Sequence, residues 1–142
     1  MADGPTSLAG AAQAIAASAL RAQQARMRVI AENIANANST SSTKGGDPYR
    51  RQAPVFEPTS VAKGAGTGVK MARVDPDQKP FRSEYEPGNP SADAQGYVKL
   101  PNVDPLVEAL DMREAQRAYE ANLNVIETAR AMEQRTLDLL KK

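Results

Sequence analysis

The chain has 142 residues, a net charge of +1 and 25% charged residues, and it contains no His, Cys or Trp. This length fits one domain, or one domain with extended appendages, and could bury a modest core. Without His or Cys there is no Cys/His zinc site, no Cys nucleophile and no Ser-His-Asp arrangement, so we expect no catalytic, metal or cofactor site. The near-neutral charge and the 4% aromatic content disfavour nucleic acid and anionic membranes as partners.

Composition divides the chain into three parts. Residues 1–37 hold 13 Ala, residues 38–102 hold eight of the ten Pro and seven of the nine Gly, and residues 103–142 return to helix-forming residues. We therefore expect two long terminal helices around an extended, β-rich or loop segment, a mainly α fold with a small β insert.

The first part begins with an uncharged, Ala-rich stretch at residues 4–20. Polar residues interrupt this stretch and Asp3 precedes it, so we expect neither a signal peptide nor a membrane-spanning helix. Thr6 or Ser7 can cap the helix. Its apolar stripe has the alternating spacing of a coiled-coil seam: Ala16, Leu20, Gln23, Met27, Ile30, Ile34 and Ala37. Asn36, Asn38 and the Ser/Thr run that follows are expected to end it.

The middle part contains four segments with strand character, at residues 49–57, 68–74, 81–86 and 96–100. The prolines inside or beside them favour edge strands. The glycine-rich residues 64–68 resemble a phosphate-binding loop, but a strand-like segment rather than a helix follows them. A flexible connector at residues 63–68 is therefore favoured. Residues 86–90 are typical of a turn. The acidic residues at 75–93 are interleaved with cations and favour a solvated surface over a cation site.

The last part predicts a second long helix, which Asn102 or Asp104 can cap and for which Pro105 fits the first turn. Its apolar stripe cannot be buried by the helix alone. We expect the two helices to pair as a coiled-coil-like antiparallel hairpin. The part of each apolar stripe that this pairing does not cover is left to contact other chains. We also expect the Ala-rich N-terminal stretch to order only on assembly.

Two amides, Gln23 and Asn122, fall on the apolar stripes. One interpretation is that they are solvated or capped. The other is that they are buried and set register and partner choice between helices. The pattern alone leaves both open.

Four blocks carry a resemblance to a known family. Residues 19–39 resemble the N-terminal signature of flagellar rod and hook axial proteins, and residues 116–122 resemble the family's second signature. Residues 46–52 and 96–105 are similar to blocks of its proximal-rod branch. The resemblance extends from about residue 12 to residue 140.

The resemblance implies a structural subunit, not an enzyme, in the basal-body rod that crosses the periplasm and transmits motor torque. The terminal helices would form its inner domain. The implied partners are copies of the chain, other rod proteins, the rod-base adaptor and MS-ring, and the flagellar type III export machinery. The alternative is a coiled-coil adaptor or a structural component of another secretion system.

Two sets of residues follow as candidates for this role. For helix packing we expect Leu20, Met27, Ile30, Ile34, Val125, Ile126, Met132 and Leu139. For the signature and intersubunit hydrogen bonds we expect Gln23, Asn33, Asn36, Asn38, Arg117, Tyr119 and Asn122.

Overall fold

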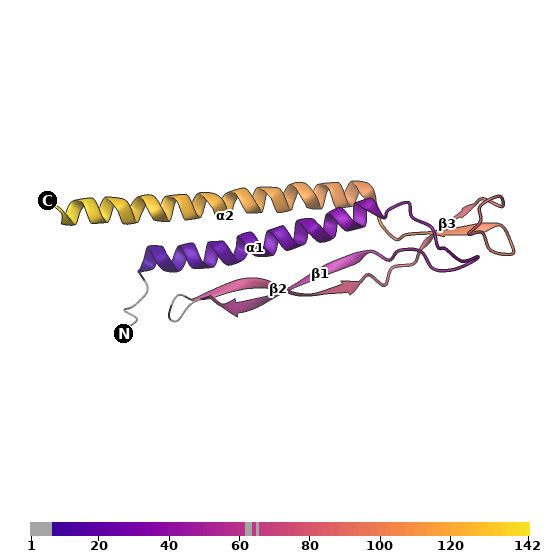
Figure 1. Cartoon of the computed structure of the whole chain (residues 1–142), viewed down its shortest axis with the longest axis horizontal. Helices are drawn as coiled ribbons and strands as arrows, with labels where there is room; N and C mark the ends of the chain where they lie inside the picture. The colour runs from indigo at the N-terminus through magenta and orange to yellow at the C-terminus, as the bar shows by residue number, and fades with distance from the viewer. Residues whose placement is uncertain (1–6, 62–63, 65) are drawn as a thin grey trace. The chain divides into compact units, whose positions relative to one another are not determined.

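The computed structural model describes residues 7–61, 64 and 66–142. Two long helices form the two ends of the chain, and the segment that joins them in the sequence contains two small two-stranded sheets (Figure 1). The elements are α1 (Leu8–Ala35), β1 (Gln52–Ser60), β2 (Thr67–Pro76), β3 (Arg82–Tyr85), β4 (Tyr97–Leu100) and α2 (Pro105–Leu140). This order confirms the expected helix-rich fold with a β insert.

The contacts divide the chain into two compact units. Unit 1 comprises residues 1–27, 55–73 and 114–142, and unit 2 comprises residues 28–54 and 74–113. Each unit contains part of α1, part of α2 and part of the middle segment, so the units do not follow the division by composition. The division into an inner helical domain and an extended segment stays a prediction.

Both helices begin at a polar cap. The Ser7 hydroxyl accepts a hydrogen bond from the Gly10 N–H at 3.0 Å, which confirms Ser7 as a cap; Thr6, the alternative, lies outside the described residues. In α2, the Asp104 carboxylate accepts a bond from the Leu106 N–H at 2.9 Å. Pro105 is the first helical residue, where its missing N–H costs nothing.

The end of α1 also follows the expected chemistry. The Asn36 amide donates to the Glu32 carbonyl at 2.8 Å, and the Ser39 hydroxyl donates to the Asn36 carbonyl at 2.9 Å. These side chains bond to backbone carbonyls at the end of the helix, and α1 ends at Ala35.

In unit 1, the two helices run side by side in opposite directions. Gln13 of α1 donates to the Glu133 carboxylate of α2 at 3.1 Å, and Arg26 lies 3.6 Å from the Glu114 carboxylate. The earlier residue of α1 thus pairs with the later residue of α2, and the later residue of α1 with the earlier one of α2, so the two helices are antiparallel. The hairpin formed by β1 and β2 contributes its residues 55–73, which include the turn, to this unit (Figure 1).

The hairpin turn uses glycine where the backbone requires it. Gly64 and Gly66 have φ angles of 79° and 108°, which L side chains rarely adopt. The Val61 N–H donates to the Gly66 carbonyl at 3.4 Å and closes the turn. Lys63 and Ala65, which belong to the predicted connector, lie outside the described residues.

In unit 2, β3 and β4 form an antiparallel pair with Arg82 opposite Leu100 and Tyr85 opposite Tyr97. The Asn89 N–H donates to the Glu86 carbonyl at 3.0 Å, which confirms the predicted turn. Each sheet has only two strands, so every described strand is an edge strand, as the prolines indicate.

Candidate functional site

Helix α1 buries two faces, not one. Two positions of the predicted stripe that lie in α1, Ala16 and Ile30, are buried, and so is Ala37 just after its end. A second row of buried residues follows the helical period beside it: Ser18, Ala22, Val29 and Asn33. The prediction of a single narrow stripe was therefore too narrow, because α1 is covered by more than its partner helix.

The hairpin covers the second face within unit 1. The Ser18 hydroxyl accepts a bond from the Val69 N–H at 3.1 Å and donates to the Ile15 carbonyl at 2.6 Å. Gly68 packs so tightly here that an added Cβ would lie 2.2 Å from the Ser18 hydroxyl oxygen and 2.3 Å from a Val61 methyl. A small residue on each side permits the close approach of strand and helix.

The predicted packing residues lie in three environments. Ile30 is buried, and Leu20, Met27 and Ile126 are half-buried. The other four are exposed in the single chain: Ile34, Val125, Met132 and Leu139. The helices therefore leave large apolar side chains in water.

An apolar groove accompanies these exposed side chains in unit 1. Its volume is about 440 Å³, and its lining includes Leu8 and Ala12 of α1 and Val125, Ala129 and Met132 of α2. Contiguous exposed apolar surface of this kind is typical of an interaction site.

The signature residues outside the cores make local bonds or face solvent. The Asn122 amide donates to the Ala118 carbonyl at 2.8 Å, Tyr119 is half-buried, and Asn38 and Arg117 are exposed. Gln23 differs from them, because its side-chain oxygen is buried and has no hydrogen-bond partner within the described part of the chain.

Asn33 is the centre of a buried polar cluster in unit 2. Its carbonyl oxygen accepts bonds from the Tyr49 hydroxyl at 2.8 Å and the Gln52 N–H at 2.9 Å. Its amide donates to the Gln52 carbonyl at 2.9 Å and the Glu108 carboxylate at 3.2 Å. The two donors and the two lone pairs of the amide are thus all satisfied.

The same cluster holds a buried ion pair. Glu108 has an exposed fraction of 0%, and its carboxylate accepts a hydrogen bond from the Arg51 guanidinium. The Arg51 guanidinium also lies 3.4 Å from the Asp77 carboxylate and 3.7 Å from the Asp111 carboxylate. The backbone N–H of Arg51 donates to the side-chain oxygen of Asn102 at 2.7 Å. A charge this deeply buried needs such partners, because it has lost its water. We call Asn33, Tyr49, Arg51, Gln52 and Glu108 the polar cluster.

The cluster shifts the pKa of two of its members. Burial, followed by the negative charges of Glu32 and Glu108, raises the pKa of Tyr49 above its usual 10.0. Burial by itself would lower the pKa of Arg51, but the hydrogen bond and charge of Glu108, together with the charges of Asp77 and Asp111, raise that pKa above its usual value. Both shifts keep the residue in the form that donates hydrogen bonds.

Sequence reasoning named Asn33 but missed Glu108 and Arg51. Glu108 lies in the first turn of α2, where an acidic side chain is ordinary at the surface. Nothing in the local pattern marks it as buried, because its partners come from residues 33 and 51. For Asn33 the only signal was the family signature.

The described residues contain no helix long and apolar enough to cross a membrane. They contain no group of three or more acidic, His or Cys side chains able to hold a metal ion. The described residues provide exposed apolar packing surfaces and the hydrogen-bonded polar cluster, which are features of an assembling structural protein.

Comparisons with known proteins agree with this class. Residues 14–41 match the family described as flagella basal body rod protein, and residues 94–139 match the C-terminal family of flagellar basal body rod FlgEFG proteins. The chain is thus placed among the flagellar rod proteins at both ends.

Relatives that match most of the chain identify the branch of this family more closely. The flagellar basal-body rod protein FlgC of Agrobacterium fabrum is 48% identical over 92% of this chain and 94% of its own. FlgC of Escherichia coli O6:H1 is 48% identical over 88% and 92%, and FlgC of Borreliella burgdorferi is 40% identical over 89% and 94%. The chain belongs to the FlgC family of flagellar basal-body rod proteins, which are structural components of the rod and not enzymes.

Proposed function

We propose that this rod protein assembles helically with copies of itself and with other rod proteins, through surfaces that the single chain leaves apolar. The observation that carries the proposal is the exposure of Ile34, Val125, Met132 and Leu139, four predicted packing residues. A side chain of this size gains about 1.5–3 kcal/mol when it passes from full exposure to full burial. These four are 38% to 74% exposed, so association with neighbours recovers the corresponding part of that energy.

The proposal includes pairing of α1 and α2 as a coiled-coil-like antiparallel inner domain. It is supported by the hydrogen bond from Gln13 to Glu133, by the ion pair between Arg26 and Glu114, and by the apolar spacing of both helices. In this proposal residues 1–37 and 103–142 form the inner domain, and residues 38–102 contact neighbours.

Torque transmission follows from many such helix contacts in series. A heterologous contact that does not close into a ring generates an open helical tube, the form that a drive shaft requires. Family membership supports other rod proteins as partners, and we extend the proposal to the rod-base adaptor, the MS-ring and the type III export machinery. An adaptor of another secretion system is not favoured, since the relatives carry the name of the flagellar rod.

Substitution of Ile34 tests the proposal. Ile34 is 38% exposed, so Ile34→Asp is expected to leave the single chain folded while placing a charge in the contact with a neighbour. We expect loss of rod assembly and of swimming in cells that carry only this variant. Ala31→Asp places the same residue at an exposed position of the same helix. This control shows how much of any effect on assembly comes from the lower helix propensity of Asp. Normal swimming of the Ile34 variant would contradict the proposal.

A further inference from the structure

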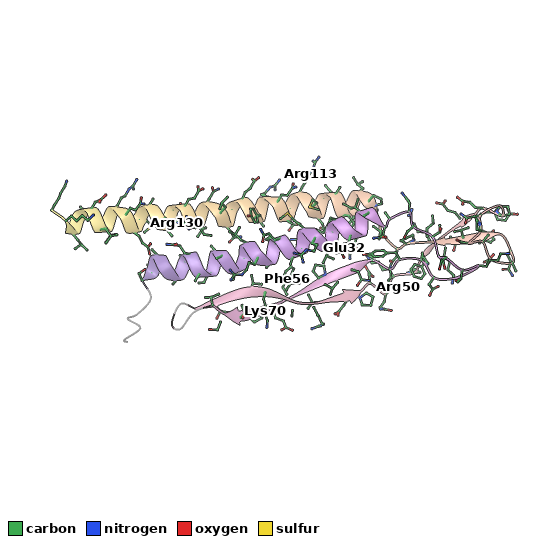
Figure 2. All side chains as sticks on the ribbon, viewed as in Figure 1. Glu32, Arg50, Phe56, Lys70, Arg113 and Arg130 are labelled. Atoms are coloured by element: carbon green, nitrogen blue, oxygen red, sulfur yellow. The ribbon has the colours of Figure 1, made fainter. Side chains whose placement is uncertain are left out.

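Unit 1 contains an open cleft between the hairpin and α1. Its volume is about 430 Å³, and its lining includes Arg21 of α1, Lys70 of β2 and the hydroxyl residues Thr59 and Ser60 of β1. Figure 2 places Lys70 on the hairpin. The cleft is open because the helix presents small side chains there, among them the buried Ala22.

The cleft carries positive charge without compensation. No Asp or Glu lines it, and neither Arg21 nor Lys70 forms an ion pair within the part of the chain that the structure describes. The hydroxyls of Thr59 and Ser60 likewise have no hydrogen-bond partner among the described residues. Two cations and two hydroxyl donors are the groups that bind carboxylates.

Unit 2 carries a complementary surface, the acidic turn, which we define as residues 84–93. It contains Glu84, Glu86 and Asp93 and no Lys or Arg. Glu84 and Glu86 are exposed, as are Pro87 and Gly88 between the strands. Its carboxylates form no ion pair with any described residue, although Glu86 accepts a bond from Asn89 at 2.9 Å.

We propose that the acidic turn of a second copy of this chain binds in the Arg21–Lys70 cleft. The inference rests on the proposed self-assembly and names one of its contacts. Cleft and turn belong to different units, so the contact joins unlike surfaces of two copies. Such a heterologous contact can propagate along an open helix, whereas a contact between like surfaces would close a dimer.

Disulfide crosslinking tests the contact directly, because the chain has no Cys of its own. We would introduce Lys70→Cys with Glu86→Cys into the full chain and oxidise isolated basal bodies. Linked dimers and higher multiples are expected. The control pair Lys70→Cys with Gln134→Cys, whose second site is also exposed, is expected to give none. Equal yields from both pairs, or no product from the first, would overturn the proposal.

Charge exchange gives an independent test. Arg21→Glu with Lys70→Glu should abolish swimming, and adding Glu84→Lys with Glu86→Lys to the same chain should restore it, provided that immunoblots show equal amounts of each variant. Swimming by the first variant, or no recovery in the second, would refute the contact. If the first variant swims while Ile34→Asp does not, only this contact fails. If both swim, the proposed self-assembly fails as well.

Discussion

At the scale of single residues, the polar cluster is the feature with the largest expected energetic effect. Glu108 has no exposed surface and bonds to both Arg51 and Asn33. Removing one partner of a buried ion pair leaves the other charge uncompensated. We expect Glu108→Ala to lower the free energy of unfolding by about 3–5 kcal/mol, measured by urea denaturation followed by circular dichroism.

Glu114→Ala is the matched control. Glu114 also faces an arginine, Arg26 at 3.6 Å, but its side chain is 69% exposed. Water screens this pair, so its loss should cost about 0–1 kcal/mol. If the two variants lose equal free energy of unfolding, the buried ion pair of the polar cluster contributes no more to stability than an exposed one.

The raised pKa of Tyr49 makes stability depend on pH. Folding favours the protonated phenol, so its contribution is fully present below the unfolded pKa of 10.0 and is lost as the pH rises through the higher folded pKa. We expect the free energy of unfolding to fall as the pH rises above about 10, with a smaller fall in Tyr49→Phe. Tyr85→Phe, at an exposed position, should keep the wild-type slope.

At the scale of elements, α1 is the helix whose environment differs most from the sequence prediction. Gly68 of the hairpin packs against this second face, where an added Cβ would lie 2.2 Å from the Ser18 hydroxyl oxygen. Gly68→Ala therefore forces the strand away from α1 and should cost about 1–3 kcal/mol of stability. Gly88→Ala, at an exposed position where an added Cβ meets no atom within 4 Å, should change stability by about 0.5 kcal/mol or less. Equal effects in thermal unfolding would show that the second face is not packed.

The elements themselves could be predicted because their signals are local. Ser7, Asp104 and Pro105 mark helix starts through bonds within the next few residues, and the glycines near residue 65 mark the hairpin turn. The start of β1 was predicted at residue 49 but lies at Gln52. Tyr49 and Arg51 instead bond to Asn33 and Asn102, and the local pattern holds no information about those partners.

At the scale of the whole molecule, we expect the single chain to remain incomplete until neighbours cover it. The first turns of α1 are rich in Ala and carry few large apolar side chains, so packing against the rest of the chain holds them weakly. Together with the exposed apolar side chains, this predicts a monomer with reduced helix content in dilute solution. Sedimentation combined with circular dichroism measures both properties. A stable, discrete oligomer with full helix content would instead favour the coiled-coil adaptor.

Neighbouring residues encode the caps, turns, apolar period and signature motifs. The two helices, the edge character of the strands and the family could therefore be predicted before the fold was known. The second buried face of α1 and the core position of Glu108 emerge only from the folded chain. The bond between Asn33 and Glu108 joins positions 75 residues apart. Burial at such positions depends on which distant groups the fold brings together, and these groups cannot be read from the residues next to them in the sequence.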